Sequence, residues 1–147
     1  MNYIKDWLIP DLRTLEARRS SLSHMKEEIE TLRLEADAIK ATNYDRVTVS
    51  GGGGNAQEDK LIANIAKRQE LEANLRVVER QVMELDDLLA ELNSEDRLII
   101  EKLYIKRERN AAAIIADTLG YDVSRVYQKK NEALLQIARR RFGLVLS

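Results

Sequence analysis

The sequence contains no cysteine, and it contains one histidine and one proline. Without cysteine the chain has neither disulfides nor thiolate zinc sites, which suits a reducing compartment. A Cys–His catalytic pair and a histidine-rich metal site are both impossible, so we expect no enzyme, no catalytic residue, no cofactor and no metal. We expect His24, which precedes Met25 in a helical stretch, to lie on a helix surface or at a helix seam.

Long apolar runs are also missing. No stretch approaches the roughly 20 residues that span a bilayer, and the amino terminus lacks the charged-then-apolar order of a signal peptide. We therefore expect a cytoplasmic protein with no membrane partner. Aromatic residues make up 5 % and charged residues 33 % of the chain, with many Ala, Glu, Leu, Lys and Arg residues. This composition favours long helices, and we predict an all-α fold.

The net charge of −1 conceals an uneven distribution. Residues 94–147 carry 11 Lys and Arg against 7 Asp and Glu, whereas residues 1–93 carry 13 against 18. A basic segment attracts polyanions through its local field even when the whole molecule is nearly neutral. The carboxy-terminal third is therefore the place to look for an anionic partner.

Residues 1–92 are predicted to form a long antiparallel helical hairpin similar to a coiled coil. Pro10 suits the first turn of the first helix, and residues 41–56 would be the glycine-rich connection. Because neither helix can bury its apolar stripe alone, the two pair with each other, and a homodimer through the hairpin is a further option. The stripes are Leu8, Leu12, Leu15, Leu22, Met25, Ile29, Leu32, Ala36 and Ile39, then Leu71, Leu75, Val78, Val82, Leu85, Leu89 and Leu92, the second at heptad spacing.

The connection contains four consecutive glycines, Gly51–Gly54. A glycine run invites comparison with a phosphate-binding loop, but no Lys followed by Ser or Thr closes it. A hinge between helices is the better interpretation. Asn55 and Glu58 have the spacing of a capping box for the second helix.

Residues 93–147 are predicted to form a three-helix domain that contains a helix-turn-helix. Ser94, Asn110 and Asp122 are candidate N-caps, and Gly120 allows a sharp corner between the second and third helices. In the second helix Ile114, Ile115 and Leu119 supply the buried bulk beside small alanines. In the third helix the residues at buried spacing are Val126, Ala133, Leu134, Ile137 and Ala138.

The remaining face of the third helix carries the residue types that contact DNA. Arg can bind guanine O6 and N7, Gln can pair with adenine, and Lys neutralises phosphate. Residues 123–141 contain six basic groups and one acidic residue, Glu132. The predicted DNA-binding residues are Val123, Ser124, Arg125, Tyr127, Gln128, Lys129, Lys130 and Asn131.

Residues 93–141 resemble region 4 of sigma-70-type factors. The resemblance rests on "LNSEDRLIIEKLY", "AAAIIADTLGYD" and "VSRVYQKKNEALLQI". It implies that Val123, Ser124, Arg125 and Gln128 contact the major groove and backbone of a promoter element. Tyr127 stands where sigma factors often have Arg, so the same base preference does not carry over.

The whole chain resembles the ArpU/RinA group of late-gene transcription regulators from phages and prophages. The most specific segments are "YDRVTVSGGGGNAQED" and the helix-turn-helix. The resemblance implies a late-gene activator that binds double-stranded promoter DNA in the cytoplasm of a bacterial host. Because no segment resembles the sigma domain that melts the −10 element, such an activator would need host RNA polymerase.

Two other functions fit the same pattern. A phage small terminase subunit also joins a helix-turn-helix to long helices, and would form a ring. A structural coiled-coil protein could carry a basic tail that binds nothing specific, because a basic helix beside an alanine-rich one is often only a bundle with a solvated face.

Overall fold

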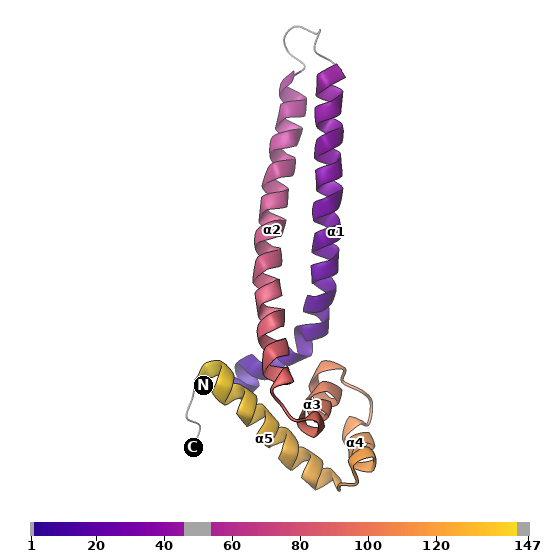
Figure 1. Cartoon of the computed structure of the whole chain (residues 1–147), viewed down its shortest axis with the longest axis vertical. Helices are drawn as coiled ribbons and strands as arrows, with labels where there is room; N and C mark the ends of the chain where they lie inside the picture. Colours follow the sequence, from indigo (N-terminus) through magenta and orange to yellow (C-terminus); the bar gives the residue numbers. More distant parts are fainter. Residues whose placement is uncertain (1, 46–53, 144–147) are drawn as a thin grey trace. The chain divides into compact units, whose positions relative to one another are not determined.

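The computed structural model describes residues 2–45 and 54–143, and every regular element in these ranges is helical (Figure 1). The all-α prediction is confirmed. Val47, Val49 and the glycines Gly51–Gly53 lie outside the described residues, as do the side chains of Tyr44 and Asn55. The elements are the π-helical turn η1 (Ile4–Leu8), α1 (Ile9–Asp45), α2 (Gly54–Ala90), α3 (Ser94–Ile100), the π-helical turn η2 (Glu101–Ile105), α4 (Ala111–Leu119) and α5 (Val123–Phe142).

The chain forms two compact units. Unit 1 comprises residues 1–19 and 81–147, and unit 2 comprises residues 20–80. The sequence places the domain boundary between residues 92 and 93, whereas the structure groups both ends of the predicted hairpin with the carboxy-terminal helices. The reason is apolar burial: Leu8, Leu12 and Leu15 are completely buried within the unit that also contains α5.

Unit 2 consists of the facing parts of α1 and α2, which run side by side (Figure 1). Their direction is antiparallel, because Lys26 pairs with Glu79 at 3.6 Å while the later residue Arg33 pairs with the earlier Glu72 at 3.4 Å. These exposed pairs contribute little stability, and the seam between the helices contributes more. Along α1 this seam consists of the buried Ile29, Leu32 and Ala36 and the half-buried Leu22, Met25 and Ile39.

One polar side chain interrupts the seam of unit 2. Asn64 is buried, and its Nδ2 donates a hydrogen bond to the backbone oxygen of Leu32 at 2.8 Å. Its Oδ1 accepts one from Arg68 Nε at 2.9 Å. Because a one-turn shift of either helix would break the cross-helix bond, Asn64 stabilises one register of the hairpin.

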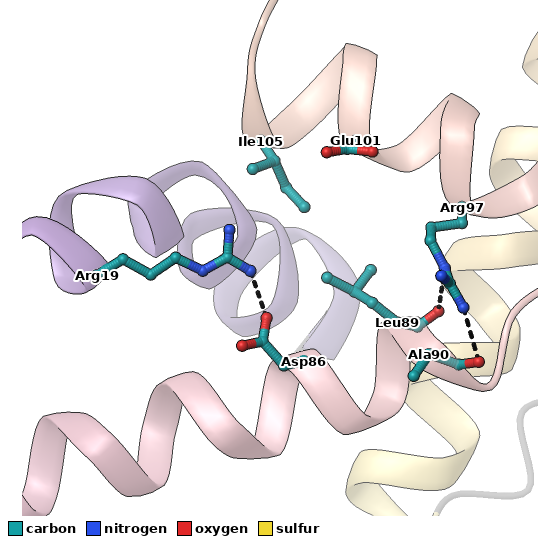
Figure 2. Close-up of a pocket in the computed structure, with 7 residues that line it drawn as sticks. All are labelled: Arg19, Asp86, Leu89, Ala90, Arg97, Glu101 and Ile105. Carbon is teal, nitrogen blue, oxygen red and sulfur yellow. Dashed lines mark hydrogen bonds and ion pairs between the residues drawn. The ribbon is translucent and has the colours of Figure 1, made fainter.

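Unit 1 holds the end of α2 and the start of α3 together through Arg97 (Figure 2). Its guanidinium donates to the backbone oxygens of Leu89, at 3.1 Å, and Ala90, at 2.8 Å. These carbonyls belong to the last turn of α2, where intrahelical partners are missing and the helix dipole is negative. The residue lines a cavity of about 270 Å³ that also contains the ion pair of Arg19 with Asp86.

Three predicted helix ends need correction. Asn93, and not Ser94, is the N-cap of α3: its side chain accepts from the Asp96 N–H at 2.8 Å. Asn110 makes no side-chain cap and instead adopts the left-handed conformation before α4, which Asn tolerates better than most residues. The connection is also shorter than residues 41–56, because α1 continues to Asp45 and α2 begins at Gly54.

The predictions of buried apolar residues were more accurate than the predictions of helix caps. All five residues predicted to be buried in α5 are buried, whereas Ile114 of α4, predicted to supply buried bulk, is exposed. His24 is exposed in unit 2, which fits the surface alternative. Among the helices of residues 2–45 and 54–143, none combines the length and hydropathy that a membrane span requires.

Candidate nucleic-acid interface

The corner between α4 and α5 consists of Gly120, Tyr121 and Asp122. Gly120 ends α4 in the left-handed conformation, at φ 71° and ψ 29°, which glycine adopts without a Cβ penalty. The Tyr121 N–H then donates to the Ala116 oxygen at 3.0 Å. Asp122 caps α5, because its Oδ1 accepts from the Arg125 N–H at 2.8 Å. The predicted corner and this cap are both confirmed.

One face of α5 is buried on α3 and α4, which fixes the rotation of the helix about its axis. Val126 lies in a core cluster with Ile99, Ala111, Ile115 and Ala116. Ala133, Leu134, Ile137 and Ala138 bury the same face over the following three turns. Because this face is fixed, the opposite face points away from the core of unit 1.

The outward face carries most of the predicted DNA-binding residues. We name the four polar ones, Ser124, Arg125, Gln128 and Asn131, the polar strip, and all four are exposed. Within it, Arg125 Nη1 donates to Gln128 Oε1 at 3.2 Å. This bond restricts both side chains and leaves further guanidinium donors and the Gln128 amide group for other partners. Two apolar residues, Val123 and Tyr127, are exposed beside the strip.

Lys129 differs from the rest of the predicted set. Its side chain is 12 % exposed, and its ammonium group lies 3.2 Å from Glu95 Oε2 and 3.5 Å from Asp96 Oδ1. It also lies 5.8 Å from the ring centroid of Tyr121. Lys129 therefore anchors α5 to the start of α3, and its charge is already neutralised by carboxylates. The sequence-based expectation that this lysine contacts phosphate does not fit that position.

The network around Lys129 also holds the corner residue. The Tyr121 hydroxyl donates to Glu95 Oε2 at 2.9 Å, and the Arg125 guanidinium lies 5.9 Å from the Tyr121 ring centroid. The hydrogen bond from Tyr121, followed by that from Lys129, lowers the pKa of Glu95. The hydrogen bond to Glu95 raises the pKa of Lys129. Tyr121 thus connects a charged anchor to the guanidinium in the polar strip.

Lys130 remains available to a phosphate. It is half-buried, and its ammonium group lies 5.4 Å from the ring centroid of Tyr127, a weak contact compared with an ion pair.

The arginines at the end of α5 are engaged within unit 1. Arg140 pairs with Glu91, and Arg141 pairs with Asp11 and with Glu84, the last at 3.2 Å. The positive charge of residues 123–141 is therefore partly neutralised by neighbouring helices. These arginines fasten the last turn of α5 to the base of the long helices.

Arg107, which is outside the predicted set, lies near α5, because it lines a groove together with Val123 and Tyr127. Arg107 adopts a left-handed backbone, at φ 49°, and its Nη2 donates to the backbone oxygen of Arg13 at 3.3 Å. Burial raises the pKa of the Tyr104 phenol, and the charge of Arg13 opposes that rise, as expected of neighbours. Arg107 is one of the 11 Lys and Arg residues counted in residues 94–147, but nothing in the sequence places Arg13, 94 residues away, next to it.

Comparison with known proteins gives a family and no close relative. Residues 38–138, about two thirds of the chain, match the family described as "Protein of unknown function (DUF1492)". The match includes the corner and the whole polar strip. No curated protein and no solved structure matches the chain.

Proposed function

Because the chain belongs to the DUF1492 family, whose description assigns no function, we propose one from the interface itself: a transcriptional regulator that binds promoter DNA through α4 and α5. In this proposal α5 enters the major groove. The polar strip contacts base edges, with Arg125 on guanine and Gln128 on adenine. Lys130 and Arg107 neutralise phosphates on either side.

The observation that carries the proposal is the hydrogen bond between Arg125 and Gln128 on an exposed, rotationally fixed helix face. Exposed arginines of the long helices pair with carboxylates, as Arg19 does with Glu16 and Arg33 does with Glu30. Here the partner is a neutral amide, and the side chains of both residues remain exposed. Because the two side chains are already restricted before binding, less conformational entropy is lost when they bind a partner.

The resemblance to sigma-70 region 4 and to the ArpU/RinA group supports the rest of the proposal. The protein acts with host RNA polymerase as an activator of late genes in a phage or prophage. It pairs with a second copy through the long helices, which places two α5 helices on one promoter.

The proposal is tested by selecting DNA from a random duplex library with the full-length protein. We expect a defined site to be enriched. On that site Arg125→Ala and Gln128→Ala should weaken binding by about 1–3 kcal/mol and leave binding to random DNA nearly unchanged. Lys130→Ala should weaken binding to both and reduce the salt dependence. Arg76→Ala and Gln69→Ala, at exposed positions of unit 2, are matched controls.

Equal loss on selected and random DNA for all three variants would contradict base readout. Failure to enrich any site would favour the structural coiled-coil alternative. Measuring the mass of the free protein tests the remaining alternative, a small terminase subunit. A ring of eight or more chains would indicate a terminase subunit, whereas a dimer would not. Transcription from a late-operon template with purified host polymerase then tests activation, which we expect to require Arg125.

A further inference from the structure

A groove lined by both apolar and polar residues lies at the side of α5 that carries Val123 and Tyr127. It has a volume of about 500 Å³. Val123 and Tyr127 line it from α5, and Leu103 with the alanines that begin α4 lines it from the opposite side. Val123 is 42 % and Tyr127 46 % exposed. Because they lie four residues apart in one helix, the two exposed side chains form a small apolar patch at the mouth of the groove.

The charges around the groove favour an anionic ligand that also has an apolar part. Arg107 and Asn110 line the groove, and Lys130 lies above the Tyr127 ring. The carboxylate that lines it, Glu108, is paired with Lys102 at 3.0 Å. Ser124 and Gln128 of the polar strip follow Val123 and Tyr127 directly in α5, about 100° further around the helix.

Duplex DNA presents one apolar group in its major groove, the C5 methyl of thymine. We propose that Val123 and Tyr127 form a thymine-methyl contact, so that the recognised site contains thymine next to the bases contacted by Arg125 and Gln128. The two side chains are one helical turn apart on the same edge of α5, which brings them to neighbouring base pairs. This inference rests on the proposed function, and it adds the base that the apolar residues select.

Replacing thymine by deoxyuridine tests the contact, because it removes the methyl group and keeps the base pairing. The substitution is made at each thymine of the site selected by the full-length protein. At one or two of these thymine positions we expect the affinity to fall about fourfold, because one methyl group is no longer buried against the protein. At the position that Val123 contacts, Val123→Ala should bind the thymine and deoxyuridine sites about equally. Val77→Ala, which shortens an exposed valine of unit 2, should retain the wild-type preference.

Val123→Ser is a second variant, and it should lose most of the preference because it replaces both methyl groups of Val123 by one hydroxyl group. If wild-type protein binds every deoxyuridine site as tightly as the thymine site, the thymine contact is wrong and base readout by the polar strip stands. If Val123→Ala keeps the full preference, the contact belongs to another residue and the assignment is overturned. If no site is enriched at all, the DNA-binding proposal itself fails.

Discussion

Replacing Lys129 by Met is expected to destabilise unit 1 without removing a DNA contact. The change deletes an ammonium group that lies 3.2 Å from Glu95 and 3.5 Å from Asp96. Breaking a fully buried ion pair costs about 3–5 kcal/mol, whereas an exposed pair costs less than about 1 kcal/mol. Glu95 is 40 % exposed and regains water, but the Asp96 side chain is 11 % exposed and loses its cation. We therefore expect a loss of about 2 kcal/mol, between these limits.

Trp7 provides the assay, because it is the single tryptophan and lies in unit 1. Its ring is edge-on to Phe142 with a centroid distance of 6.3 Å, so its fluorescence reports the packing of η1 on α5. A loss of about 2 kcal/mol should lower the thermal midpoint by about 4–8 °C for a chain of this length. Lys130→Met is the matched control and should lower it by less than about 2 °C, since it removes only a contact with Tyr127.

A second substitution separates charge from packing. Asp96→Asn combined with Lys129→Met removes the unpaired carboxylate and should recover part of the loss. At a temperature where both proteins are folded, Lys129→Met should bind DNA almost as the wild type does, whereas Lys130→Met should bind more weakly. The reasoning is refuted if Lys129→Met is no less stable than Lys130→Met, or if it is fully stable and binds all DNA more weakly.

Three further outcomes follow from the same structure. Because the pKa of Glu95 is lowered in the folded state, its stabilising effect is present above the ordinary pKa of 4.5 and is lost as the pH falls through the lowered value. The urea midpoint of Glu95→Gln should therefore fall less than that of the wild type when the pH is lowered. Gly120→Ala should cost about 1 kcal/mol in Trp7-monitored unfolding from backbone strain alone, since no atom lies within 4 Å of the added Cβ, and an unchanged midpoint would refute the strain. Asn64→Ala should lower the unfolding free energy measured by circular dichroism by about 1 kcal/mol through the lost bond to Leu32, whereas the exposed Asn74→Ala should not.

Most of the buried helix faces could be predicted from the spacing of apolar residues in the sequence. In α5 the spacing from Val126 to Ala138 indicated one buried face, and the repeats of the two long helices indicated that neither could bury its apolar stripe alone. Periodicity failed for Ile114, because α4 has nine residues and almost all of them are apolar, so no single face stands out.

Lys129 and the unit boundary could not be predicted because both depend on contacts between distant segments. Lys129 lies on the border between the buried and exposed faces of α5, where a long side chain can point either way. The carboxylates of α3 decide its direction, and only the packing of α3 on α5 brings them close. In the same way, Asp11 meets Arg141 across 130 positions of sequence, which no local pattern records.

That long-range pairing has a consequence for how the protein is made. Residues 1–19 belong to a unit whose other members begin at residue 81, so during translation the first segment emerges well before its packing partners exist. Tyr3 contacts Phe142, and Asp11 pairs with Arg141, so the packing of this unit is complete only after residue 142 has been added. A chain that stops before residue 141 therefore lacks the ion pairs that fasten the last turn of α5 to Asp11 and Glu84, and we expect it to be less stable than the whole unit.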